Sequence, residues 1–154
     1  MSLETVVEPA SPERRRWLSV LAKAAPGELE AGWEQLAERP SFTALRAPET
    51  GLVLVRGRMG GTGDAFNVGE MTVTRAAVRL GGGETGVGYV AGRSRRHAEL
   101  AAALDAMMQS PALRPGAEAL VGRLEDAQRA RREAAARKAA ATRVDFFTMV
   151  RGED

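Results

Sequence analysis

The spacing of apolar residues changes twice along this chain of 154 residues, and this change restricts the fold class. Up to about residue 40 the large apolar side chains recur at helical intervals. Residues 51–91 instead hold runs rich in Val, Leu and Thr between clusters of glycine, which is typical of strands. From residue 94 the helical spacing returns. Strands grouped between helices indicate an α+β protein: a small antiparallel sheet flanked by an N-terminal helical hairpin and C-terminal helices.

Serine and proline mark the helix starts near the N-terminus. Ser11 can cap the free amides of a helix, and Pro12 suits the first helical turn. Pro26 begins a second helix, for the same reason. The length fits one domain. We therefore expect a flexible lead over residues 1–10 and a single domain over residues 11–154.

The middle of the chain carries the strand signals. We expect strands over residues 51–58, 71–80 and 87–91, with a weaker strand over residues 42–46. Residues 59–69 are rich in glycine and are interpreted as a connection between strands. The last two strands are joined by a short glycine turn, so at least this part of the sheet is predicted to be antiparallel.

That turn, residues 81–86, also satisfies the spacing G-x-G-x-x-G of dinucleotide-binding proteins. In those proteins a helix follows the glycines directly, so that its free amides meet the pyrophosphate. Here a strand follows. We therefore interpret the glycines as a hairpin turn.

The last third of the chain is helical and then changes character again. Ser94 can cap one helix, and a second, polar helix is expected over about residues 116–143. Its residues 125–143 include no Leu, Ile, Val, Met or aromatic residue, so this part has little to bury. Residues 144–150 then form a strand signal that must pair with a sheet in this chain or in a partner. Three of its side chains are candidates for a partner interface: Phe146, Phe147 and Met149.

Composition excludes several classes of site. Without cysteine the chain has no disulfide, thiolate metal site or iron–sulfur ligand, and a single histidine excludes multi-histidine metal sites. We expect no metal. No stretch approaches the ~20 apolar residues of a membrane helix, and no signal peptide is visible, so we expect a cytoplasmic protein away from membranes. Only Lys23 and Lys138 are lysines and the net charge is +2, which argues against nucleic acid as a partner.

The glycine-rich connection and its flanks form a candidate anion site. Arg56 and Arg58 leave the same face of their strand. Guanidinium groups together with backbone amides exposed at glycines suit phosphate or phosphonate oxygens. The alternative is a structural connection whose arginines pair with nearby carboxylates, which is the more common arrangement. The candidate residues of this region, for substrate, phosphate or a partner, are Arg56, Arg58, Gly60, Gly61, Gly63, Asn67, Glu70 and Arg75.

Arg93 and His97 lie at the expected start of a helix, where an anion would be favoured, and they complete the candidate list. We favour a structural interpretation of His97, as a half-buried histidine at the end of a core stripe. The arginine run at residues 14–16 is interpreted as a solvated first turn. No base and nucleophile occur together in a recognisable arrangement, so no catalytic residue is assigned.

Five segments together resemble the PhnG subunits of the bacterial carbon–phosphorus lyase system. They read RWLSVLA at residues 16–22, PETGLVLVRGRMGGTG at 48–63, FNVGEMTVTR at 66–75, GYVAGR at 88–93 and VDFFTMVRG at 144–152. These matches span nearly the whole chain, and the central and C-terminal blocks are long and specific.

The resemblance implies a core complex that also contains PhnH-, PhnI- and PhnJ-type subunits. It implies an early step of phosphonate catabolism, in which methylphosphonate is transferred onto the ribose of ATP. Adenine leaves, and α-D-ribose 1-methylphosphonate 5-triphosphate forms. ATP is then a substrate of the complex, and no cofactor is expected in this chain. The iron–sulfur cluster and S-adenosylmethionine of a later radical step belong to the PhnJ-type subunit. No catalytic residue is carried over to this chain.

We therefore expect an accessory subunit of a transferase that has no activity alone. Two alternatives stay open. One is a purely structural scaffold, in which the arginines make only ion pairs. The other is a stand-alone phosphate- or nucleotide-binding protein, which would need a complete site within one chain.

Overall fold

A three-stranded antiparallel sheet forms one layer of the computed structural model, which describes residues 10–143. Its strands are β1 (Phe42–Arg58), β2 (Ala65–Leu80) and β3 (Thr85–Ala91), in the order β1-β2-β3. A single 3-10 turn, η1 (Met59–Gly61), follows β1. The predicted α+β class and the antiparallel hairpin between β2 and β3 are confirmed.

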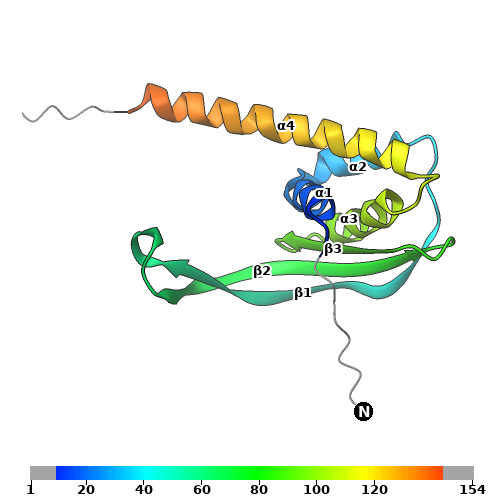
Figure 1. The fold of residues 1–154 in the computed structure, drawn as a ribbon, viewed down its shortest axis with the longest axis horizontal. Helices are drawn as coiled ribbons and strands as arrows, with labels where there is room; N and C mark the ends of the chain where they lie inside the picture. The colour runs from blue at the N-terminus through cyan, green and yellow to red at the C-terminus, as the bar shows by residue number, and fades with distance from the viewer. Residues whose placement is uncertain (1–9, 144–154) are drawn as a thin grey trace, which may run out of the picture.

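Four helices lie on one side of this sheet (Figure 1). They are α1 (Pro12–Lys23), α2 (Pro26–Glu34), α3 (Arg95–Met108) and α4 (Arg114–Ala141). Helix α3 packs directly on the sheet, α1 and α2 pack on α3, and α4 contacts α1, α2 and α3. The predicted caps are confirmed, because the hydroxyl groups of Ser11 and Ser94 accept hydrogen bonds from the first turns of α1 and α3. We call the covered face of the sheet the helix-side face and the opposite one the outer face.

The core lies between α3 and the helix-side face, and glycine allows α3 to come close. A Cβ atom added at Gly88 would lie 1.9 Å from the carbonyl oxygen of Ala98, and one at Gly86 would lie 1.9 Å from that of Ala102. No side chain fits in such a space. Gly86, the last glycine of the G-x-G-x-x-G spacing, therefore serves helix–sheet packing rather than phosphate binding.

A buried carboxylate joins α1, α3 and β3. Asp105 on α3 is fully buried, and its Oδ1 accepts hydrogen bonds from Arg14 Nε at 3.1 Å and from Trp17 Nε1 at 2.8 Å. Its Oδ2 accepts from Arg14 Nη2 at 2.7 Å and from the backbone N of Val87 at 2.9 Å. The hydrogen bond to Asp105 raises the pKa of Arg14. The interpretation of residues 14–16 as wholly solvated is thus wrong for Arg14.

The strands are longer than the sequence predicts. Residues 42–46 and 51–58 belong to one continuous strand, β1. Its register with β2 shifts on either side of Arg46 and again between Val55 and Arg56. Strand β2 begins at Ala65 and not near residue 71, because residues 65–70 pair with β1 across the turn. Hydrogen bonds between the strands pair the backbone N–H and C=O groups of this glycine-rich stretch, and local composition does not predict such pairing.

The polar helix predicted for the last third is present as α4. Its first half is anchored, and Gln128 donates a hydrogen bond to the carbonyl oxygen of Val20 at 2.8 Å. Beyond Gln128 its side chains are exposed, and this half extends past the other helices (Figure 1). No helix within residues 10–143 is long and apolar enough to span a membrane. Residues 1–9 of the predicted lead over residues 1–10 lie outside the described residues. So does the predicted strand over residues 144–150, with its three interface candidates.

Candidate functional site: the β1–β2 arm

Half of the β1–β2 hairpin extends beyond α1, α2 and α3 as a two-stranded arm, which we define as residues 51–71 (Figure 1). Strand β3 pairs with β2 only between Val73 and Arg79, so within residues 10–143 the arm has no third strand. An isolated two-stranded hairpin is at best marginally stable in water. The arm carries seven of the eight predicted residues of the glycine-rich region.

The helix-side face of the arm carries the predicted charges. Arg56 lies opposite Asn67, and Glu70 lies opposite Leu54. Arg58 is two residues beyond Arg56, so both guanidinium groups leave the same face, as predicted. Within residues 10–143, the side chains of Arg56 and Glu70 make neither a hydrogen bond nor an ion pair. These two charged groups are thus available to a ligand or to another protein.

The glycines at the arm's tip have a structural explanation. Gly60 and Gly61 adopt φ values of 61° and 80°, which residues with a side chain rarely adopt. The backbone N of Gly63 donates to the carbonyl oxygen of Met59 at 2.9 Å. Arg58 Nη1 donates to the carbonyl oxygen of Gly63 at 3.0 Å, so this arginine also closes the turn. The tip is therefore a tight turn that presents one free guanidinium group, that of Arg56.

Arg75 does not join this group. It lies on the outer face, beyond the base of the arm, and its Nε donates to Glu49 Oε1 at 2.6 Å. Arg46 Nη1 donates to the same oxygen at 2.7 Å. Hydrogen bonds from Arg46 and then from Arg75 lower the pKa of Glu49. At this position the structure agrees with the alternative in which arginines pair with nearby carboxylates.

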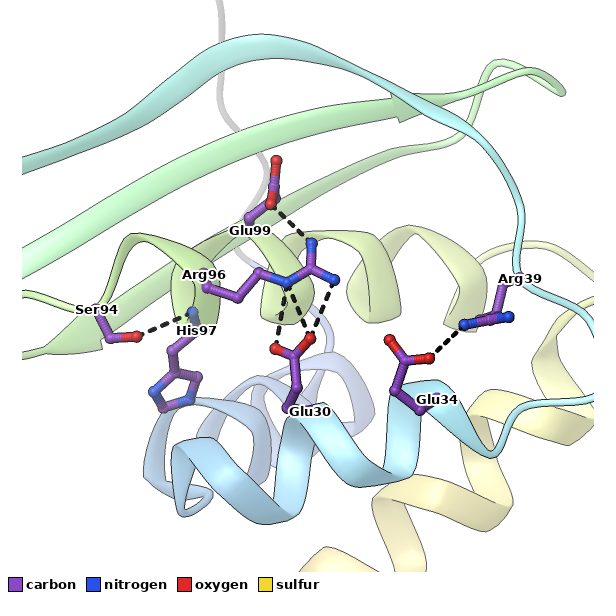
Figure 2. A network of polar contacts seen from close by, with 7 residues as sticks. All are labelled: Glu30, Glu34, Arg39, Ser94, Arg96, His97 and Glu99. Carbon is purple, nitrogen blue, oxygen red and sulfur yellow. Dashed lines mark hydrogen bonds and ion pairs between the residues drawn. The ribbon is translucent and has the colours of Figure 1, made fainter.

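The two predicted residues near α3 are also separate from the arm's tip. Arg93 is exposed and follows β3, whereas His97 is buried and its Nε2 lies 2.8 Å from the carbonyl oxygen of Leu21. Figure 2 shows Ser94 at the start of α3 and Arg96 between Glu30 of α2 and its own neighbour Glu99. The structural interpretation of His97 fits this placement, because the ring is enclosed by protein.

Figure 2 also shows an ion pair, between Arg96 and Glu30, that was not among the predicted site residues. Arg96 links α2 to α3, and its hydrogen bond to Glu30 is the main reason that its pKa is raised. A second pair, Arg39 with Glu34, follows on the same side of α2. The partners in the first pair are separated by 66 residues, so helical spacing gave no signal for it.

The predicted residues thus fall into two sets. Arg56, Arg58, Asn67, Glu70 and the three tip glycines are gathered on the arm, whereas Arg75, Arg93 and His97 lie elsewhere. Within the described part of the chain, no group of three or more His, Asp or Glu side chains could hold a metal ion. The arrangement suits charge-matched contact with phosphate or with protein, and the role of each residue stays a prediction.

Fold and site together define a small α+β protein with a protruding, arginine-bearing β-hairpin. The family model described as "Phosphonate metabolism protein PhnG" matches residues 12–152. The chain is also 49% identical over 142 residues to a curated protein of Rhizobium meliloti (strain 1021), covering 92% of this chain and 91% of that protein. That relative is named "Alpha-D-ribose 1-methylphosphonate 5-triphosphate synthase subunit PhnG". The chain belongs to the PhnG family, as its sequence predicts.

Proposed function

We propose that this chain is an accessory subunit of an α-D-ribose 1-methylphosphonate 5-triphosphate synthase. The observation that carries the proposal is the 49% identity, over nearly the full length of both chains, to a protein that bears this name. The complex transfers methylphosphonate onto the ribose of ATP. A phosphonate oxygen forms the new bond to the anomeric carbon, adenine leaves, and the triphosphate is retained. Because ATP is the substrate, we place the complex in the cytoplasm.

The reacting groups of this transfer come from partner subunits of the PhnI, PhnH and PhnJ types. Departure of adenine needs a group that can deliver a proton. In this chain the single histidine is buried and lies against a backbone carbonyl. A chain without cysteine also offers no thiolate ligands, so the iron–sulfur cluster and S-adenosylmethionine of the later step belong to the PhnJ-type partner. ATP binds to the complex as a substrate, and this chain holds no cofactor of its own.

The arm supplies this chain's contribution. Arg56 is free within the described residues, and Arg58 lies beside it with its Nη1 on the turn. Two guanidinium groups on one face can neutralise a triphosphate or meet carboxylates of a partner. The pairing of Arg75 with Glu49 favours one alternative, the structural scaffold, for the arginines outside the arm.

The test is co-expression of the chain with the other three subunits. Assembly is followed by size-exclusion chromatography, and turnover by the release of adenine from ATP in the presence of methylphosphonate. Omission of this chain is expected to abolish adenine release. If release continues without it, the proposed function is wrong.

A double substitution tests the arm's arginines in the same system. We expect Arg56→Ala with Arg58→Ala to lower adenine release at least about tenfold, since each lost charge-assisted contact is worth roughly 1.5–3 kcal/mol. Arg132→Ala with Arg137→Ala, on the exposed half of α4, is the control for an equal change of charge. Loss of turnover with intact assembly supports a phosphate role, and loss of both supports a partner contact. Unchanged assembly and turnover would leave only the scaffold alternative.

A further inference from the structure

The outer face of the arm is entirely apolar. On β1 it carries Val53, Val55 and Gly57, because these residues alternate with Leu54 and Arg56 of the helix-side face. The β2 side is given by cross-strand pairing and by the contact at Gly57, where an added Cβ would lie 2.7 Å from Val68 and 3.8 Å from Phe66. The β2 residues of this face are Phe66, Val68, Gly69 and Met71. Val68 and Gly69 share the face although they are consecutive, because the register shifts between Val55 and Arg56 and leaves Val68 without a direct partner.

This face is open to solvent within residues 10–143. The side chains of Val55, Phe66, Val68 and Met71 are all exposed. Contiguous apolar surface on a projecting element is uncommon in a protein that acts alone, and it marks a site of contact with another macromolecule. Because no described strand pairs with the arm as a third strand, covering this face would stabilise the hairpin itself.

A shallow hollow of about 330 Å³ lies on the outer face at the base of the arm. Gly51, Val53, Val73 and Tyr89 line it, and the ion pair of Arg75 with Glu49 forms part of its wall. Val53 belongs to both the hollow and the arm, so the two form one surface. The hollow thus combines apolar and charged groups, and it continues the apolar outer face of the arm. Mixed surfaces of this kind are common in protein–protein interfaces.

We propose that the outer face of the arm, together with this hollow, is the docking surface for another subunit of the synthase. This inference rests on the proposed function and deepens it. The absence of formal charge on the seven outer-face residues, in a chain that is 27% charged, requires an uncharged, apolar partner surface. A phosphate, a nucleic acid or an acidic peptide does not match such a face.

The two faces of the arm then have different tasks. Docking through the outer face leaves the opposite face, with Arg56, Arg58 and Glu70, directed away from the docked surface. A rigidly held hairpin presents its guanidinium groups in a fixed place, which lowers the entropy cost of binding an anion between subunits. The apolar face thus positions the charged one.

Substitutions at two side chains of nearly equal exposure, one on each face, test the two faces separately. Val68 on the outer face is 61% exposed, and Leu54 on the helix-side face is 63% exposed. We therefore compare Val68→Lys with Leu54→Lys, each made in the full chain and co-expressed with the PhnI-, PhnH- and PhnJ-type subunits. Met71→Lys is a second outer-face variant. Circular dichroism of each purified variant verifies folding, and the measured quantity is the ratio of captured partner subunits to affinity-tagged chain.

We expect Val68→Lys and Met71→Lys each to lower this ratio at least about tenfold, because a lysine at an apolar centre must be desolvated without a counter-charge. Leu54→Lys should stay within about twofold of the unaltered chain. Equal ratios for the unaltered chain and both outer-face variants would overturn the docking surface while leaving the proposed function intact. An equal loss in Leu54→Lys, or a homodimer of the isolated chain that Val68→Lys dissociates, would also overturn it. If the unaltered chain captures no partner, the proposed function fails with it.

Discussion

Asparagine at position 105 should strongly destabilise this fold, although it scarcely changes the shape of the side chain. Each carboxylate oxygen of Asp105 accepts two hydrogen bonds, one from Arg14 and one from either Trp17 or Val87. In Asp105→Asn one oxygen becomes an NH2 group, which cannot accept. The two N–H donors that bonded to the replaced oxygen then point at this NH2 group, and the buried position of residue 105 gives them no water to bond instead.

The magnitude follows from these lost contacts. A hydrogen bond to a charged group contributes roughly 1.5–3 kcal/mol, and breaking a buried ion pair costs about 3–5 kcal/mol. The Arg14 side chain is 29% exposed and can be rehydrated, which places the expected loss at the lower end, about 3 kcal/mol. For a domain of this size such a loss lowers Tm by roughly 6–12 °C.

Urea unfolding of the isolated chain, followed by circular dichroism, measures the free energy of unfolding. Asp126→Asn is the matched control, because Asp126 pairs with Arg129 on the surface and its side chain is 67% exposed. We expect that control to change stability by no more than about 0.5 kcal/mol. A loss below about 1 kcal/mol in Asp105→Asn would refute the assignment of Asp105 as the polar link between α1, α3 and β3.

Two further predictions concern the sheet. Gly88→Ala should lower the free energy of unfolding by about 2 kcal/mol or more, because the new methyl group meets the backbone oxygen of Ala98. Gly51→Ala is the control, since open space surrounds Gly51, and it should be near neutral in the same urea assay. The pKa of Glu49, measured by NMR titration, should lie below that of an ordinary glutamate and should rise in Arg46→Gln, because Arg46 is the first of the partners that lower it. The pKa of Glu49 is lower in the folded state than in the unfolded chain. The stability contributed by this pair is therefore present above the ordinary glutamate pKa and is lost as the pH falls through the lowered value. A Glu49 pKa unchanged by Arg46→Gln would contradict the pairing.

Local signals predicted where the helices begin and which segments are strands, whereas the long-range contacts and the full length of the strands were not predictable. Ser11 with Pro12, and Ser94, mark helix starts because capping involves only neighbouring residues. The pairing of Arg14 with Asp105 joins residues 91 positions apart, and nothing in either local pattern indicates it. The same holds for Gly88, whose role is a close approach of α3.

The candidate site shows the same division. Alternation along β1 correctly placed Arg56 and Arg58 on one face, because strand periodicity is local. It could not place Arg75, whose face follows from the pairing of two strands and which turns out to bind Glu49. The apolar outer face of the arm was also not predictable, because residues 65–70 lie in a glycine-rich stretch that resembles a loop. A register shift at Val68 also breaks the alternation that marks a strand, so the faces follow only from the pairing with β1.

Under the proposed function, this chain contributes binding surfaces to a transferase whose reacting groups lie in other subunits. The most direct measurement is adenine release from ATP and methylphosphonate by the purified chain alone, compared with the same chain after the PhnI-, PhnH- and PhnJ-type subunits are added. We expect no adenine release above the buffer control for the chain alone and sustained release in the complete mixture. Sustained release of adenine by this single chain, free of the other subunits, would contradict this expectation.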